Sequence, residues 1–191
     1  MDKRNIEATK KSILEAAEKL MTECSDPSEV TSRAITKEAN VNLAMINYCF
    51  GSRDALLFEV FGKLQTKAQK ENPEFIKIIT SPGSPKEKLK EIYYQSVRIM
   101  LSHFTYTKAI TKYALLERKI SVERGSLPFI KAHYGERKNE KECLLIAFEL
   151  SAIHELAVLR HKEIQETCGT DLTDEIQLKK YISDHIDMYL D

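Results

Sequence analysis

The segment TSRAITKEANVNLAMINYCFGSRDALL, residues 31–57, decides how this chain folds. Thr31 offers a hydroxyl that can cap a short helix, and apolar residues three and four positions apart give that helix one buried face. Asn40 tolerates the left-handed backbone region, and Asn42 can cap another helix that begins near Leu43. The spacing therefore predicts a short helix, a tight turn and a second short helix.

Longer amphipathic helices are expected on both sides of this segment. Residues 5–23 repeat apolar side chains at helical spacing, with lysine and glutamate on the opposite face. Gly51 provides a stop after the second short helix, and residues 53–70 again carry leucine, valine and phenylalanine at helical intervals. Four helices in this stretch predict an N-terminal domain over residues 1–70.

A linker is expected at residues 72–85, which are rich in proline, glycine and serine, with residues 75–79 as an alternative extra turn inside it. The rest of the chain also shows helical periodicity. A short helix is expected to start at Ser126. The sequence contains few glycines and prolines, which suits long helices rather than a sandwich or barrel. These patterns predict an all-α fold with a second domain over residues 71–191, whose longer helices cover residues 85–102, 106–118, 139–167 and 173–190.

Charge and composition limit the kinds of function that this chain can have. Lysine plus arginine equal aspartate plus glutamate at 29 each, so any nucleic-acid site must be local. Residues 41–53 contain no acidic side chain. This absence is expected of an element that approaches DNA phosphates, because phosphates repel carboxylates. The N-terminus has no secretory signal pattern and no long apolar run exists, so we expect a cytoplasmic protein. The cysteines are widely spaced, and we expect neither a metal nor a cofactor.

Residues 31–57 resemble the DNA-binding region of the TetR (tetracycline-repressor) family of bacterial transcriptional regulators. The resemblance covers roughly the first 65 residues, and the remainder matches in length and helical character. Asn40 stands where most members have glycine, and Cys49 stands where they usually have histidine. The resemblance implies an N-terminal helix-turn-helix DNA-binding domain and a C-terminal helical ligand-binding and dimerisation domain. It also implies a homodimer through the two C-terminal helices, double-stranded operator DNA as partner, and a small-molecule effector that releases a repressor.

The chemistry of the side chains and the family resemblance indicate the same DNA-contacting positions. The hydroxyls and amides at the start of the first short helix attract phosphate oxygens, although simple capping would explain them equally well. Asn47 can pair with adenine through two hydrogen bonds in the major groove. Tyr48 and Arg53 are expected to contact DNA phosphates. The alternatives are that Tyr48 packs in the core and that Arg53 is solvated beside Asp54. The DNA-binding candidates are Thr31, Ser32, Arg33, Asn42, Leu43, Ala44, Met45, Asn47, Tyr48 and Arg53.

Aromatic and polarizable side chains are frequent between residues 91 and 134, which is typical of an apolar pocket with a few polar groups. An ordinary helical core would need the same residue types. The ligand-binding candidates are Tyr93, Met100, His103, Phe104, Tyr113, Phe129 and His133.

Two other functions remain possible from the sequence. An all-α enzyme or small-molecule carrier without DNA binding would fit the helical pattern, but the chain has no Ser-His-Asp pattern, metal-ligand cluster or phosphate-binding glycine loop. We therefore do not expect an enzyme. A nucleoid protein that binds DNA of any sequence would show an excess of positive charge, which this chain lacks.

Overall fold

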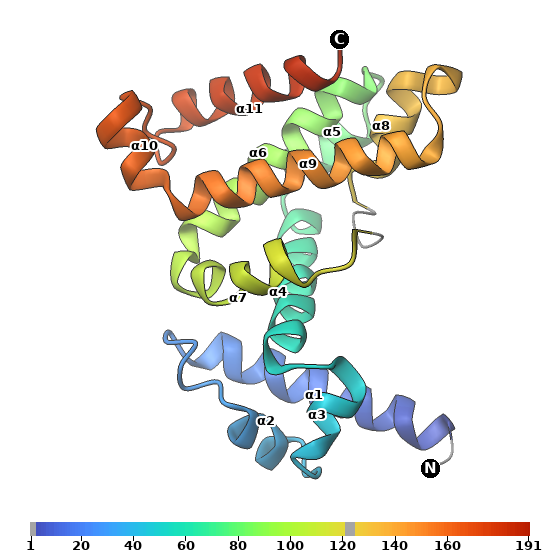
Figure 1. The fold of residues 1–191 in the computed structure, drawn as a ribbon, viewed down its shortest axis with the longest axis vertical. Coiled ribbons are helices and arrows are strands. Elements are labelled where there is room, and N and C mark those ends of the chain that lie inside the picture. Colours follow the sequence, from blue (N-terminus) through green and yellow to red (C-terminus); the bar gives the residue numbers. More distant parts are fainter. Residues whose placement is uncertain (1–2, 121–124) are drawn as a thin grey trace. The chain divides into compact units, whose positions relative to one another are not determined.

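The computed structural model describes residues 3–120 and 125–191, and within these ranges its regular secondary structure is entirely helical (Figure 1). This confirms the all-α prediction. The chain divides into two compact units, Met1–Lys67 with Thr105–Glu117 and Ala68–Phe104 with Arg118–Asp191. The helices are α1 (Lys3–Glu23), α2 (Ser32–Glu38), α3 (Ala44–Phe50), α4 (Arg53–Lys70), α5 (Pro73–Thr80), α6 (Pro85–Ser102), α7 (Phe104–Leu116), α8 (Leu127–Tyr134), the 3-10 helix η2 (Gly135–Arg137), α9 (Glu140–Leu159), α10 (His161–Cys168) and α11 (Glu175–Tyr189).

The first unit is built on α1, which packs against both α2 and α3, while α2 and α3 also contact each other (Figure 1). Each of the three helices buries an apolar face, and α4 adds two leucines that are completely inaccessible to solvent. Such burial stabilises by about 1.5 to 3 kcal/mol for each large side chain, so this small core holds the short helices in place. The buried residues include Ile13, Ala17, Ile35, Ile46, Leu56 and Leu57.

Helix α7 belongs to the first unit, except for Phe104. The buried Tyr106 donates a hydrogen bond from its hydroxyl to the carbonyl oxygen of Cys24, with 2.7 Å between the two oxygens. The ring of Tyr113 lies against that of Phe58 on α4, with centroids 5.6 Å apart. The sequence division at residue 70 placed this helix with the C-terminal domain, because amphipathic spacing reveals a buried face but not the partner that covers it.

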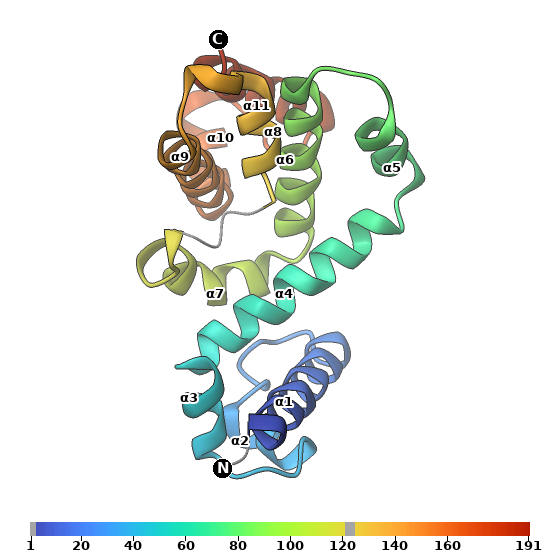
Figure 2. The same ribbon diagram turned by 90° about the vertical axis from the view of Figure 1, so that its right-hand side faces the viewer.

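The second unit is organised around α6, which packs against α5, α8, α9 and α11 (Figure 2). Its core contains residues from all of the longer helices of this unit, and Leu89, Leu150 and Ile186 in it are completely buried. Helix α6 begins at the predicted position, where the Ser84 hydroxyl accepts a hydrogen bond from the backbone N–H of Glu87. Helix α6 therefore contacts most of the other helices of this unit.

The expected linker at residues 72–85 contains a helix. The Asn72 side chain caps α5 by accepting hydrogen bonds from the backbone N–H groups of Glu74 and Phe75, and Pro73 occupies the first turn. Phe75 is buried, and α5 packs on α6. The punctuating residues thus act as a cap and a first turn, which composition alone could not distinguish from a linker.

The single helix expected at residues 139–167 is interrupted at Arg160, where φ is −105° and ψ is 17°. Helix α9 ends before this residue and α10 begins after it. The ring of His161 donates from Nδ1 to the Val158 carbonyl at 2.8 Å, which stabilises the break locally. The apolar pattern runs across the break without interruption, so periodicity did not predict it. Among the described residues, no helix combines the length and apolar character that a membrane crossing requires.

Candidate functional site

The turn between α2 and α3 has the geometry that the sequence predicts. Thr31 has extended backbone geometry, and its hydroxyl accepts a hydrogen bond from the Ala34 N–H at 3.1 Å. Asn40 has a φ of 52°, in the left-handed region that asparagine tolerates better than most residues. The Val41 N–H then donates to the carbonyl of Thr36, which closes the end of α2. Helix, tight turn and helix follow within 20 residues.

The outer face of this second helix is formed by four side chains that point away from the core. Leu43 is 46% exposed, Tyr48 is 64% exposed, and Ala44 and Asn47 are also exposed. They share a face because residues three and four positions apart lie together on a helix. Ile46 is 1% exposed and anchors the opposite face in the core. A short helix fixed on one side and open on the other has the form of a recognition element in a helix-turn-helix.

Two further candidates on this segment have local structural roles. The Asn42 side-chain oxygen accepts a hydrogen bond from the Ala44 N–H at 2.9 Å, in a local turn one residue before Leu43, the N-cap of α3. Met45 is half-buried. The atoms best placed to meet a partner therefore belong to the four residues of the outer face and to the NH2 group of Asn42, which is also exposed.

Arg53, predicted to contact a phosphate, binds the protein's own backbone. Its Nε donates to the carbonyl of Val30 at 2.7 Å, Nη2 donates to the carbonyl of Pro27, and Nη1 pairs with the Asp54 carboxylate at 3.2 Å. The side chain is only 27% exposed. Arg53 thus ties the connection between α1 and α2 to the start of α4. Its pair with Asp54 matches one sequence interpretation, but neither interpretation foresaw the two backbone carbonyls.

The candidates at the start of α2 differ in accessibility. Thr31 and Arg33 are exposed, whereas Ser32 is half-buried and its backbone carbonyl accepts a hydrogen bond from the Thr36 hydroxyl. The Thr31 hydroxyl is used as the helix cap, which is the structural alternative foreseen for it. The Arg33 side chain makes no hydrogen bond or ion pair within the described residues, so its guanidinium is available to an anion.

The predicted ligand-binding residues do not form one group. Tyr113 lies in the first unit and the other six lie in the second. Tyr93 is buried, with its hydroxyl 3.2 Å from that of Ser151, while His103 is exposed at the end of α6. His133 contacts the carbonyl of Asp191 through Nε2 at 3.1 Å. The remaining three are partly buried hydrophobic side chains packed against the core of the second unit, namely Met100, Phe104 and Phe129.

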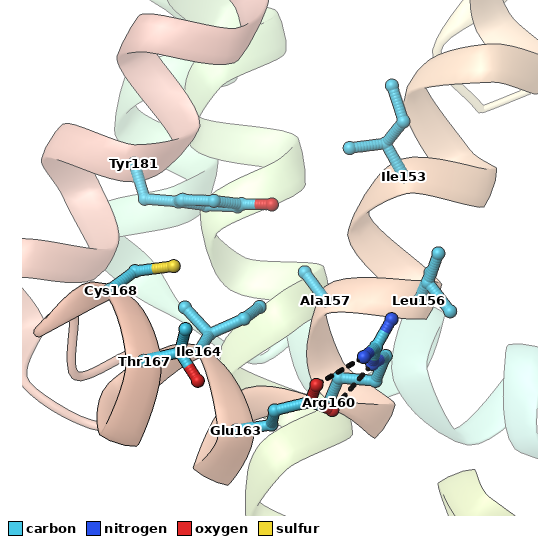
Figure 3. A pocket seen from close by; sticks show the side chains of 9 residues that line it. All are labelled: Ile153, Leu156, Ala157, Arg160, Glu163, Ile164, Thr167, Cys168 and Tyr181. Atoms are coloured by element: carbon cyan, nitrogen blue, oxygen red, sulfur yellow. Dashed lines mark hydrogen bonds and ion pairs between the residues drawn. The ribbon is translucent and has the colours of Figure 1, made fainter.

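A cavity of about 330 Å³ lies among α9, α10 and α11 within the second unit (Figure 3). Tyr181 extends from α11 into it, and burial raises the pKa of this phenol. Arg160 and Glu163 form an ion pair at its edge. Sequence reasoning missed this cavity because it depends on the break at Arg160, which turns α10 away from the line of α9. Its lining residues are Ile153, Leu156, Ala157, Arg160, Glu163, Ile164, Thr167, Cys168 and Tyr181.

A buried histidine lies next to this cavity in the core. His154 donates from Nδ1 to the carbonyl of Leu150 at 2.6 Å, and its ring lies 4.7 Å from that of Tyr93 and 6.0 Å from that of Tyr181, centroid to centroid. Its Nε2 has no hydrogen-bond partner within the described residues. Burial lowers the pKa of His154 to about 4, so this imidazole is neutral at pH 7. No group of three or more histidine, cysteine or acidic side chains in the described ranges is placed to hold a metal ion.

Comparisons with known proteins agree with this geometry. Residues 13–60 match the model of the family described as bacterial regulatory proteins, tetR family. The match covers the second half of α1, the helix-turn-helix and the first turns of α4. No curated protein sequence matches the chain. Among solved structures, the TetR family repressor AlkX from Dietzia sp. strain DQ12-45-1b is similar at 20% identity and a TM-score of 0.59, over 95% of this chain and 94% of that chain. Its description states that it is implicated in the biodegradation of n-alkanes. Residues 13–60 are therefore a helix-turn-helix domain of the tetR family of bacterial regulatory proteins, within a chain that has the fold of a TetR family repressor.

Proposed function

We propose that this protein is a dimeric transcriptional repressor that binds double-stranded operator DNA through α3 and releases it when a small molecule binds the second unit. The observation that carries the proposal is the exposed, acid-free face of α3, held by a buried Ile46 in a tetR-family domain. The role as a repressor follows the likeness in fold to AlkX, which is itself a repressor. This function puts the protein in the cytoplasm, where operator DNA lies.

The contacts with DNA divide into two kinds in this proposal. Asn47, Leu43 and Ala44 face the base edges of the major groove, while Tyr48 reaches a phosphate. Arg33 contributes a charged phosphate contact from α2, because its guanidinium has no partner within the described residues. Arg53 supports the site indirectly, since its donors hold backbone carbonyls.

Dimerisation is proposed to use α9 and α11. Four of the exposed large apolar side chains lie on these two helices, among them Leu145 at 51% and Met188 at 78% exposed. Apolar side chains gathered on one surface of a soluble protein favour a protein contact. A two-fold dimer also presents two recognition helices to two half-sites of a palindrome. Ile182 on α11 is only 1% exposed and belongs to the core of the unit, so it does not contribute to this surface.

The dimer surface can be tested by a charge substitution that leaves the cavity intact. We expect Leu145→Glu to remain folded and to sediment as a monomer, because Leu145 is exposed and does not line the cavity. Ile76→Glu on α5 is the matched control, an exposed apolar residue of the same unit outside α9 and α11. Sedimentation velocity on both variants decides the point, and a dimeric Leu145→Glu would place the interface elsewhere.

The effector is proposed to bind the cavity among α9, α10 and α11. Its volume of about 330 Å³ lies at the lower end of the range for small-molecule sites, and its lining is mainly apolar with one phenol and one ion pair. A thermal-shift screen of small apolar compounds would identify a binder. The affinity of this binder should fall about tenfold in Tyr181→Phe, because the variant removes the phenol that donates a hydrogen bond to the ligand. An unchanged affinity would place the ligand elsewhere, including at the aromatic residues chosen from the sequence.

DNA binding itself is tested by selecting sequences from a random duplex pool with the full-length protein. We expect the selected duplex to bind at least about a thousandfold more tightly than a scrambled duplex of the same length. Tyr48→Ala should weaken binding to both duplexes similarly, whereas Lys63→Ala, an exposed change on α4, serves as the control. Equal affinity of the wild-type protein for both duplexes would refute the proposal of operator recognition.

A further inference from the structure

The exposed surface of α3 and its flanking turns carries no charged side chain. Residues 41–52 contain no lysine, arginine, histidine, aspartate or glutamate. The groups that face outward are the amides of Asn42 and Asn47, the aliphatic side chains of Leu43 and Ala44, and the phenol of Tyr48. The recognition surface is therefore neutral, and it combines two amides and a phenol with two apolar groups.

The nearest cations along the chain do not change this surface. Arg53 directs its guanidinium to the carbonyls of Val30 and Pro27 and to Asp54. Arg33 and Lys37 lie on α2, the first helix of the motif, which crosses the DNA backbone rather than entering the groove. Asn42 is exposed but uses its side-chain oxygen for the Ala44 N–H, which leaves only its NH2 group for a partner. Asn47 is the exposed amide on α3 itself, and neither its side-chain oxygen nor its NH2 group makes a hydrogen bond within the described residues.

The four base pairs differ in what they offer to such a surface. Guanine presents two acceptors in the major groove, which proteins most commonly bind with arginine or lysine. Adenine presents an acceptor and a donor that match an asparagine amide, and thymine presents a methyl group that fits an apolar side chain. A neutral face on which Asn47 offers both a donor and an acceptor beside two aliphatic groups is complementary to A·T pairs, and it lacks the usual partner for guanine.

We propose that α3 reads A·T pairs, with Asn47 bound to an adenine and Leu43 and Ala44 against thymine methyl groups at adjacent positions. This inference rests on the proposed function, since it identifies the base composition of the operator that α3 would contact. The central positions of each half-site are then A·T pairs, and the sequence preference at those positions comes from methyl contacts as well as from one amide.

The experiment uses the full-length wild-type protein and chemically altered operators obtained from the random duplex pool. Replacing thymine by uracil at one contacted position removes only the methyl group, and we expect about a fourfold loss of affinity. Replacing adenine by 7-deazaadenine removes the N7 acceptor, and we expect about a tenfold loss at the Asn47 position. The same replacements outside the half-sites provide the control and should leave the affinity unchanged.

Protein variants then assign each loss to its side chain. In Leu43→Ala the uracil duplex should bind as well as the thymine duplex, because the side chain that contacts the methyl group is gone. Leu116→Ala is the matched control, an exposed leucine on α7 of the same unit, and it should retain the fourfold difference. Circular dichroism confirms that both variants are folded, and the modified duplexes test the wild-type protein independently of either variant.

The possible outcomes separate this inference from the function on which it rests. Selected half-sites with G·C pairs at their central positions, or wild-type binding that is indifferent to uracil and 7-deazaadenine, would overturn the A·T reading but leave operator recognition intact. Selection of no preferred sequence would overturn both.

Discussion

Arg53→Ala should destabilise the first unit, because this guanidinium holds the connection between α1 and α2. Two of its nitrogens donate to the carbonyls of Val30 and Pro27, residues that are themselves buried. A hydrogen bond from a charged donor contributes about 1.5 to 3 kcal/mol. The side chain is 27% exposed, so water replaces part of each bond, and the lower figure applies to both. Their sum is about 3 kcal/mol, and the exposed pair with Asp54 adds little.

Hydrogen exchange of the full-length protein measures this effect within the first unit, without assuming that both units unfold together. Amides of α1 and α2 should lose protection by about a hundredfold in Arg53→Ala, which corresponds to about 3 kcal/mol. Arg33→Ala provides the control, because Arg33 is exposed and has no partner within the described residues. Its protection should stay within about twofold of the wild type.

A lysine at position 53 distinguishes the structural role from a phosphate contact. Lys keeps the charge but lacks the planar fork that reaches two carbonyls, so Arg53→Lys should also reduce protection. A phosphate contact would survive this substitution. This structural role is refuted if Arg53→Ala keeps the hydrogen-exchange protection of the wild type while the slope of log affinity for DNA against log salt concentration falls by about one.

Three further changes test other parts of the fold. Tyr106→Phe removes the hydrogen bond to the Cys24 carbonyl and should lower hydrogen-exchange protection at the end of α1 by about 1 kcal/mol; no loss would argue against α7 as part of the first unit. His154 has a folded-state pKa of about 4 against 6.5 when unfolded, so the unfolded chain binds more protons between these values. The free energy of unfolding should therefore fall by about 3 kcal/mol from pH 7 to pH 4 in urea titrations, and His154→Phe should lack this component. Ile182→Asp should cost at least about 3 kcal/mol in the same titrations, whereas Leu116→Asp, at a 73% exposed position outside α9 and α11, should cost less than about 0.5 kcal/mol.

Local chemistry alone determined the helix-turn-helix. The Thr31 cap, the left-handed Asn40 and the terminating Gly51 each act within a few residues along the chain, and each has in the structure the conformation that its residue type predicts. Helical periodicity likewise located α1, α4, α6 and α11, because an amphipathic pattern records which face of a helix is buried. The neutral face of α3 is also a property of the sequence, since residues 41–52 contain no charged side chain.

Tertiary structure decided the features that depend on residues distant in the chain. Arg53 meets carbonyls 23 and 26 residues earlier, and Tyr106 meets Cys24 across 82 residues, so no local pattern could assign these partners. The cavity exists because the helix breaks at Arg160 and α10 turns toward Tyr181. The apolar spacing of α9 and α11 predicted that both helices bury a face, but only the packing decided that Ile182 faces the core while Leu145 faces solvent. Periodicity specifies a face, and the free energy of packing selects what covers it.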